Sequence, residues 1–258
     1  MVPRLNNNRH MTRSTIPSAG VWAKSTALVL FLVSSGCDDE PTDSSDSGLT
    51  SAEIGDAARG AELFEDKFCA DCHAYGEIGG GDAPPLDFMR GRLTAADIAN
   101  MAGSIWNHLP GMLDHFEEEG IEVPTFSGND MADLLAYLHG GMSSGAPHNK
   151  GPAGHVGGHD VPSEELGDAA AGERLFVDKG CSDCHAFDGE GGDDAPALDG
   201  MMGHMSATEI ANMSGTLWNH LPDMIEHYEE EGMSLPTFAD DEMADLIAFL
   251  HGGRGRPM

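Results

Sequence analysis

Two short strings in this chain place two thiols and one imidazole at a fixed spacing. They are residues 69–73, CADCH, and residues 181–185, CSDCH. Two cysteines that stand two residues apart can each form a thioether with one vinyl group of the same porphyrin, and the adjacent histidine can then supply an axial nitrogen to the iron. Because Cys-x-x-Cys-His is the attachment pattern of c-type haem, the chain is expected to carry two covalently attached haem c groups.

Two other uses of a Cys-x-x-Cys pair fit this sequence less well. A structural zinc site normally takes a second pair of ligands nearby, and neither string has one. A redox-active dithiol does not require the following histidine. The haem interpretation therefore assigns these attachment residues and proximal iron ligands: Cys69, Cys72, His73, Cys181, Cys184 and His185.

The second string begins 112 residues after the first, and its surroundings repeat at the same offset. Aligned without a gap, residues 55–141 and 167–253 are identical at 52 of 87 positions, about 60%. This period is too long for a stacked supersecondary repeat, so the sequence predicts a duplicated domain. Each copy is small for an independent core, and a covalent haem would supply a large apolar surface to pack against.

The segments around the two copies are expected to lie outside the folded domains. Residues 142–163 are rich in Gly, Pro and His without apolar periodicity, which is typical of a linker, although a histidine-rich tract can also bind metal. Residues 38–52 are acidic and rich in serine, which predicts a tether without a core. The predicted boundaries are 1–36 for a signal peptide, 37–54 for the tether, 55–141 for the first domain, 142–163 for the linker and 164–253 for the second domain.

The amino-terminal segment is expected to direct export. Residues 1–24 carry four basic side chains and no acid, and residues 27–33, ALVLFLV, are too short to span a membrane as a mature helix. The next four residues, SSGC, resemble the lipobox of bacterial lipoproteins, in which the cysteine is lipidated. Since the other four cysteines are assigned to haem, Cys37 is the predicted lipidation site. An ordinary cleaved signal and an uncleaved anchor are the alternatives, and Met11 is an alternative start.

The charge of the chain restricts its partners. The formal net charge is −31, and the basic segment 1–36 contributes +4, so the remainder carries −35. Such a surface repels nucleic acid and anionic lipid, so no nucleic-acid partner is expected. It favours a redox partner with a basic docking patch, although acidity also serves solubility alone.

Apolar spacing predicts an all-α fold. In the first copy we expect helices over residues 57–67, 95–108, 111–119 and 131–138, with a break at Pro110. A glycine-rich loop at residues 79–81 follows the haem string, and no alternating strand pattern is present in the sequence.

On these residues each copy resembles a class I c-type cytochrome. That family begins with a Gly-x-x-x-aromatic helix, which crosses a closing helix near the end of the domain. It also has a proline about a dozen residues after the haem histidine, and the carbonyl of this proline orients the imidazole. The resemblance implies two tandem cytochrome c-like domains. The residues at the matching positions are Gly60, Phe64, Pro84, Leu134 and Tyr137 in the first copy, and Gly172, Phe176, Pro196, Leu246 and Phe249 in the second.

The sequence departs from the family at the sixth iron ligand. Many small bacterial members carry the distal methionine in Met-Pro-x-Phe, whereas this chain has Val123 and Leu235 there, and neither can bind iron. Both copies instead contain the string W-N-H-L-P-x-M. Met112 and Met224 are the predicted distal ligands, because Pro110 would start a helix just before the first of them. The alternatives are His108 and His220, or an open site.

Other repeated residues receive structural roles. Trp106 and Trp218 are predicted to pack against haem, with the indole N–H reaching a propionate. His139 and His251 end the closing helix, where the helix dipole favours a cation, so they are predicted at the surface. Two further pairs are expected to fill the core: Met101 and Met213, and Met131 and Met243.

These features predict an electron carrier and not an enzyme. An iron with two protein ligands can pass single electrons, but it cannot bind a substrate without losing a ligand. We therefore expect a periplasm-facing, lipid-tethered protein that moves electrons between a membrane donor and a terminal acceptor. The alternatives are a di-haem peroxidase, which needs two unlike haems and fits near-identical domains poorly, and a sensor or gas-binding module with a labile sixth ligand.

Overall fold

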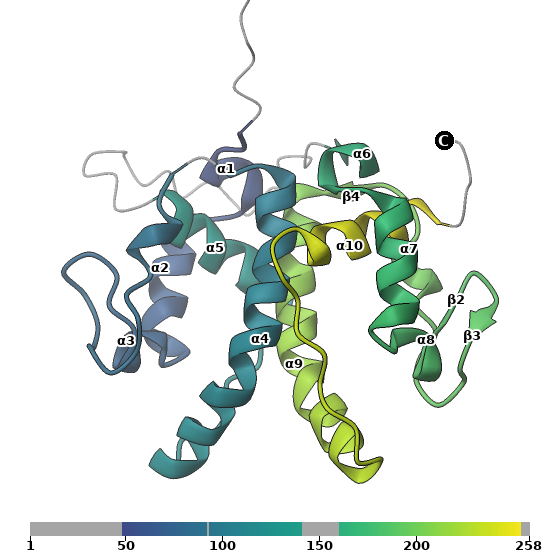
Figure 1. Ribbon diagram of the computed structural model, residues 1–258. Helices are drawn as coiled ribbons and strands as arrows, with labels where there is room; N and C mark the ends of the chain where they lie inside the picture. The colour runs from purple at the N-terminus through teal and green to yellow at the C-terminus, as the bar shows by residue number, and fades with distance from the viewer. Residues whose placement is uncertain (1–47, 92, 141–159, 254–258) are drawn as a thin grey trace, which may run out of the picture. The chain divides into compact units, whose positions relative to one another are not determined.

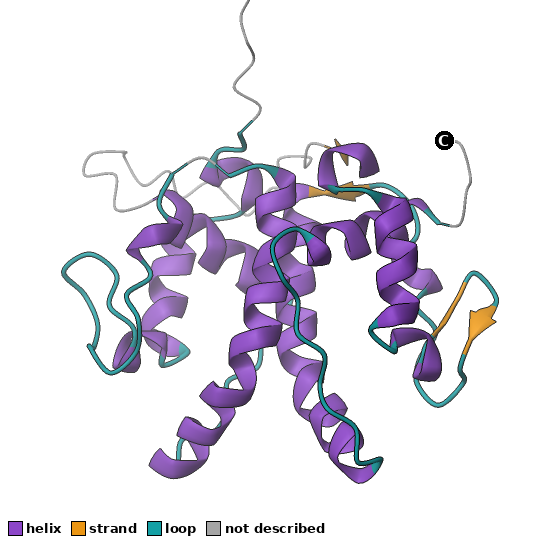
Figure 2. Cartoon of the chain, viewed as in Figure 1, coloured by secondary structure: helices purple, strands orange, loops and turns teal. Residues whose placement is uncertain are grey.

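The structure, a computed structural model, describes residues 48–91, 93–140 and 160–253, and these residues form mainly helices (Figure 2). The predicted signal peptide, Cys37 and residues 142–159 of the predicted linker lie outside them. The first copy contains α1 (Ser51–Ile54), α2 (Ala57–Asp66), α3 (Cys69–Cys72), η1 (Asp87–Met89), α4 (Ala95–Glu119) and α5 (Asp130–Gly140). The second contains β1 (Asp160–Val161), α6 (Ser163–Leu166), α7 (Ala169–Asp178), α8 (Cys181–Cys184), β2 (Ala186–Phe187), β3 (Glu190–Gly191), η2 (Asp199–Met201), β4 (Met205–Ser206), α9 (Ala207–Glu230) and α10 (Glu242–Gly252). None of the described helices is long and apolar enough to cross a membrane.

The strands are minor additions to a helical fold. β1 pairs antiparallel with β4, with Val161 opposite Met205, and β2 pairs antiparallel with β3. Each strand has only two residues. The all-α class predicted from the sequence is therefore confirmed.

The first and last helices of each copy cross at a glycine. If Gly60 of α2 carried a Cβ, that atom would lie 1.9 Å from the carbonyl oxygen of Asp133 in α5, so the crossing requires a residue without a side chain. In the second copy, Gly172 of α7 lies equally close to Asp245 of α10. Three aromatic rings pack around each crossing: Phe64, Tyr75 and Tyr137 in the first copy, and Phe176, Phe187 and Phe249 in the second.

The predicted helix break at Pro110 is wrong, because α4 runs without interruption through this residue. The helix begins at a capping box in which Thr94 accepts from the backbone of Asp97, and it ends at Gly120 in the left-handed conformation. Leu109, next to the proline, is fully buried. Tertiary packing of this kind can hold a helix together at a residue that propensity alone disfavours.

Short segments that the sequence assigned to the tether and linker belong to the core. Leu49 is buried and forms a backbone bridge to Leu93, and Ile54 of α1 is fully buried. In the second copy Val161 of the predicted linker is buried in the same way, as is Leu166 at the start of the predicted second domain. The duplicated unit therefore begins before residues 55 and 167. The prediction of a coreless tether is wrong for its last residues, because two of their apolar side chains, Leu49 and Ile54, are buried in the core.

The predicted surface position of His139 and His251 is also wrong. Both imidazoles are buried, and each donates from Nε2 to a carbonyl of the preceding segment: Leu49 at 3.0 Å and Val161 at 3.3 Å. Nδ1 of both rings has no hydrogen-bond partner among the described residues. Each ring therefore connects the end of α5 or α10 to the amino-terminal segment of its own copy by a hydrogen bond.

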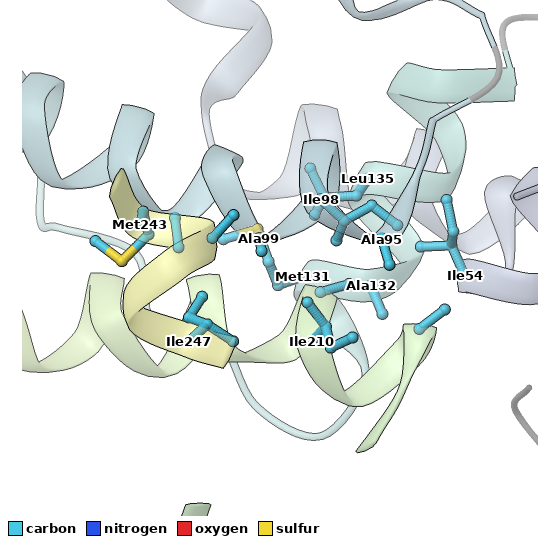
Figure 3. Close-up of a cluster of buried hydrophobic side chains, with 14 of the residues drawn as sticks. Ile54, Ala95, Ile98, Ala99, Met131, Ala132, Leu135, Ile210, Met243 and Ile247 are labelled. Carbon is cyan, nitrogen blue, oxygen red and sulfur yellow. The ribbon is translucent and has the colours of Figure 1, made fainter. Parts of the chain in front are cut away.

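The two copies pack together through their long helices, α4 and α9, which lie side by side (Figure 1). The start of α10 packs against α4, and α5 packs against α9. Figure 3 shows the resulting core, in which side chains of both copies touch. The described residues of both copies therefore belong to one compact unit. The labelled members of this shared core are Ile54, Ala95, Ile98, Ala99, Met131, Ala132 and Leu135 from the first copy, and Ile210, Met243 and Ile247 from the second.

Candidate haem sites

Each Cys-x-x-Cys pair forms a single helical turn. α3 and α8 contain the two cysteines of one string at their ends, and the histidine follows as the C-cap, with its N–H bonded to the carbonyl of the first cysteine at 2.9 Å. Residues three apart in a helix lie on one side, so both thiols of a string face the same way. The residue before each turn, Phe68 or Gly180, has a left-handed backbone with φ of 63° or 78°.

The glycine-rich loop lies directly on this turn. Gly79 has φ of +101°, and a Cβ built on it would stand 2.1 Å from the carbonyl oxygen of His73. Gly80 donates to the carbonyl of Ala70 at 2.8 Å, and Ala83 donates to that of Cys72 at 3.1 Å. The second copy repeats these contacts through residues 191–195. Glycine is therefore needed so that the loop backbone can hold the cysteine turn in place.

The proximal histidines are oriented from one ring nitrogen. Nδ1–H of His73 donates to the carbonyl oxygen of Pro84 at 2.8 Å, and His185 makes the same bond to Pro196 at 2.8 Å. This bond places the ring proton on Nδ1 and leaves the Nε2 lone pair for a metal. The arrangement is the one that the sequence resemblance implies for these two prolines.

The thiols do not resemble those of a redox dithiol. Burial raises the pKa of Cys69 and of Cys181 to about 11, so these thiols are protonated at neutral pH. Burial also raises the pKa of Cys72, with a further contribution from nearby carboxylates. Reactive thiolates have lowered pKa values. The environment is therefore suited to cysteines that become thioethers.

A cavity of about 460 Å³ opens beside the cysteine turn of the second copy. Lys179 lines it from the end of α7, Asp183 lines it from α8, and Tyr228 lines it from α9. Met233, Ser234, Pro236 and Thr237 also line it, and they flank Leu235 at the family's distal position. We call residues 123–126 and 235–238 the distal turns. Residues beside the second cysteine turn and residues of the second distal turn therefore line one cavity.

One face of each long helix carries a stripe of half-buried apolar residues. Met101, Ile105, Met112 and Phe116 follow helical spacing along α4, and they pack against the edge of the core. The matching stripe of α9 ends at Tyr228, which lines the cavity. Met224 shares this face one turn earlier.

The histidines of the W-N-H-L-P-x-M strings lie elsewhere. His108 and His220 are exposed, and Nδ1–H of His108 donates to the carbonyl of Ser104 in its own helix at 2.7 Å. The structure thus places Met112 and Met224 on half-buried faces and the two histidines toward solvent.

The structure uses Trp106 and Trp218 differently from the predicted propionate contact. The indole N–H of Trp106 donates to the carbonyl of Pro236 at 2.6 Å, and that of Trp218 donates to Pro124 at 2.7 Å. Each donor is therefore occupied by a backbone carbonyl of the other copy. A carbonyl at hydrogen-bond distance satisfies a buried N–H, so the predicted role of this group is corrected.

Several residues at the sites were not identified from the sequence. Lys67 donates to the carbonyl of Thr125 at 2.5 Å, and Lys179 donates to that of Thr237 at 2.7 Å, so a lysine beside each cysteine turn holds its own distal turn. Asn107 and Asn219 bind the distal turn of the other copy. Asparagine is unfavourable in the interior of a helix. Its presence at the same interior helix position in both copies is a sequence signal that could have identified these contacts.

The fold and these sites together define a duplicated c-type cytochrome. The sequence model of the cytochrome c family matches the chain twice, over residues 57–141 and 169–253. These matches cover more than half of the chain, which therefore belongs to the cytochrome c family. No individual curated protein matches the chain.

Family membership implies two covalently attached haem c groups, and the residues present fit them. The cysteine turns hold two thiols on one side, and the histidines are fixed with Nε2 available for iron. Haem c supplies one-electron chemistry at its iron when it is bound. The role of this chain's residues is to attach the group and to orient one axial ligand.

Proposed function

We propose that this protein is a di-haem electron carrier that passes single electrons between a membrane donor and a terminal acceptor at the periplasmic face of a bacterial envelope. Haem-based electron transfer follows from the two cytochrome c domains. The observation that carries the proposal is the repetition of one complete site: the same cysteine turn, the same imidazole bond of 2.8 Å and the same lysine contact occur in both copies. Two like sites suit relay of one electron at a time.

The experiment compares three properties of the mature protein. Acid–acetone extraction should leave haem on the polypeptide, and a reductive titration should take up two electrons per chain. Carbon monoxide should bind slowly or not at all to the reduced protein, and peroxide turnover should be absent. Haem that extracts freely would refute attachment, whereas rapid peroxide turnover or rapid carbon monoxide binding would favour the peroxidase or the sensor.

We assign Met112 and Met224 as the distal iron ligands. They lie on the half-buried face of α4 and α9, and the corresponding face of α9 ends at the cavity beside the cysteine turn. His108 and His220 are exposed on the same helices, so they are the weaker candidates. Thioether sulfur favours the ferrous state and raises the reduction potential of an iron, in keeping with a carrier that accepts electrons readily.

A lipid at Cys37 would hold the carrier at the membrane. Its support is the sequence of residues 27–37, in which an apolar stretch precedes a lipobox-like string. Acyl chains gain about 0.8 kcal/mol per buried CH₂, so more than one chain anchors a protein stably. Cys37→Ser should release the protein from membranes without changing its haem content. Intact wild-type protein without any lipid mass would contradict the anchor.

The redox partner is proposed to carry a basic docking patch. Burial raises the pKa of the more accessible cysteine of each site, and nearby carboxylates raise it further: Asp82, Asp71 and Glu119 act on Cys72, and Asp194, Asp183 and Glu231 act on Cys184. Charge complementarity of this kind speeds encounter and fixes orientation more than it raises affinity.

A further inference from the structure

Each long helix uses a Trp-Asn pair to bind the distal turn of the other copy. The indole N–H of Trp106 donates to the carbonyl of Pro236 at 2.6 Å. The amide of Asn107 donates to the carbonyl of Phe238 at 2.6 Å and accepts from its N–H at 2.9 Å. Three hydrogen bonds therefore run from a single dipeptide of α4 to a distal turn that lies 130 residues later in the sequence.

The reverse contact is the same in every part. Trp218 donates to the carbonyl of Pro124 at 2.7 Å. Asn219 donates to the carbonyl of Phe126 at 2.7 Å and accepts from its N–H at 2.9 Å. Because each asparagine both donates to and accepts from one backbone residue, its amide has only one orientation that satisfies both bonds. The same contact therefore occurs at both sites.

Packing reinforces these hydrogen bonds. The rings of Trp106 and Phe238 meet edge to face with centroids 5.5 Å apart, and so do those of Trp218 and Phe126. All four side chains are less than a tenth exposed. The hydrogen bonds of the two indole groups, which belong to these buried rings, lose less to solvent competition than exposed ones do. The distal turns are therefore firmly held from the neighbouring copy.

The same turns are held on their other side by their own copy. Lys67 binds the carbonyl of Thr125, and Lys179 binds that of Thr237, while both lysines stand two residues before a haem-attaching cysteine. The ammonium groups also lie over the turn's phenylalanine, at 5.4 Å and 5.0 Å from the ring centroids. Each distal turn thus joins its own cysteine turn to the Trp-Asn pair of the other copy.

We propose that each copy positions the distal wall of the other copy's haem site, with Trp106 and Asn107 serving the haem on Cys181 and Cys184, and Trp218 and Asn219 serving the haem on Cys69 and Cys72. The proposal rests on the haem-binding function above. These four are positioning residues, because they act through the distal turns. The two sites are consequently coupled: a change in one copy alters the haem carried by the other.

The test is a crosswise comparison in the full-length di-haem protein. Asn107→Ala removes two hydrogen bonds from the second distal turn, which should raise the open population of that turn about tenfold. The reduction potential and the haem-methyl NMR shifts of the haem on Cys181 and Cys184 should change, and carbon monoxide should bind about tenfold faster there. The haem on Cys69 and Cys72 should keep its values. Asn219→Ala should give the mirror-image result.

Two further variants make the test decisive. Ser104→Ala is the matched control, because the Ser104 hydroxyl bonds only within α4, to the carbonyl of Asn100 at 3.4 Å, and it should change neither haem. Trp106→Phe keeps an aromatic ring against Phe238 and removes the indole donor together with part of the ring's volume. If Asn107→Ala fails to mature, Trp106→Phe should still shift the second haem alone, by less.

Several outcomes would overturn the inference. Effects of Asn107→Ala on the first haem alone, on both haems equally, or on neither would each refute positioning across the copies. These outcomes are separate from failure of the proposed function, which would appear as wild-type protein that lacks covalent haem or does not take up electrons reversibly. Each haem is identified by NMR contacts to its own thioether cysteines, so the assignment does not depend on its potential.

Discussion

At the scale of residues, each site has a proximal histidine held in one orientation and lacks the methionine that the family places at its distal position. The carbonyl of Pro84 fixes the proton of His73, so this imidazole has one orientation and one free nitrogen. The opposite side lacks the family's methionine, because Val123 occupies that position. Met112 of α4 is half-buried, and it is the residue that we propose as the distal ligand.

We expect Met112→Ala to remove about half of the long-wavelength Met–iron charge-transfer band of the oxidised protein, since one of two like haems would lose its thioether ligand. The potential of that haem should fall, and its reduced iron should bind carbon monoxide. The double variant with Met224→Ala should lack the band. His108→Ala, which alters an exposed side chain, is the control and should retain it. A full band in the double variant would mean that another methionine binds iron.

At the scale of elements, the closing helices are secured by buried histidines. His251 in α10 is 2% exposed, and it holds the carbonyl of Val161. Burial lowers the pKa of His251 below its ordinary value, with His204 acting in the same direction and Val161 and Glu209 opposing it. The folded protein therefore favours the neutral form of the His251 ring over the protonated form.

The lowered pKa of His251 makes the attachment of the segment around Val161, at the start of the second copy, sensitive to acid. In the unfolded chain His251 takes up a proton as the pH falls through about 6.5, whereas in the folded protein it does so only at lower pH. The contribution of His251 to the free energy of unfolding is therefore fully present above about pH 6.5. It declines below that pH, by at most about 1.4 kcal/mol per pH unit. Denaturant titrations at several pH values between about 7.5 and about 5 should show this slope. His251→Gln should flatten the slope, and His220→Gln, at an exposed position, should leave it unchanged. An unchanged slope in His251→Gln would assign it to other groups.

The parts of this molecule that local sequence determines were predictable, and those that depend on contacts between copies were not. The cysteine strings are read from spacing, and the crossing glycine Gly60 and Pro84 are read from the family resemblance; the family match and the structure agree with them. The acidic composition around Leu49 concealed a buried residue, because composition averages over a segment. Pro110 indicated a break that packing on both sides of it overrides. The partner of Asn107 lies 131 residues away, and no local pattern encodes such a pair.

At the scale of the whole molecule, charge and duplication have separate consequences. The chain's net charge of −31 surrounds both sites with carboxylates, so its encounter with a partner is expected to depend on electrostatics. The duplication has produced two sites within one core, because α4 packs with α10 and α9 packs with α5.

Electron transfer to a basic partner should therefore weaken with salt. The Debye length falls from about 10 Å at 0.1 M to about 3 Å at 1 M ionic strength, so the attraction is screened over this range. The second-order rate constant with a basic cytochrome as probe should drop at least about tenfold between low and high salt. An acidic probe protein is the control, and its slower reaction should accelerate with salt. A rate that is independent of salt with both probes would contradict electrostatic docking.

The contact between the long helix of one copy and the closing helix of the other should be sensitive to a single methyl group. A Cβ at Gly103 of α4 would stand 2.9 Å from Cβ of Met243 in α10, and that atom is fixed to the backbone of its helix. Gly103→Ala should therefore force the two helices apart and cost about 1–3 kcal/mol, which corresponds to a fall in Tm of roughly 2–10 °C for a unit of this size. Gly111→Ala is the matched control on the same helix, because its Cβ would meet nothing within 4 Å. The control should raise stability by up to about 1 kcal/mol, since alanine favours a helix over glycine. Chemical unfolding of both variants would decide the matter, and equal stabilisation by the two substitutions would show that the copies do not depend on this close approach.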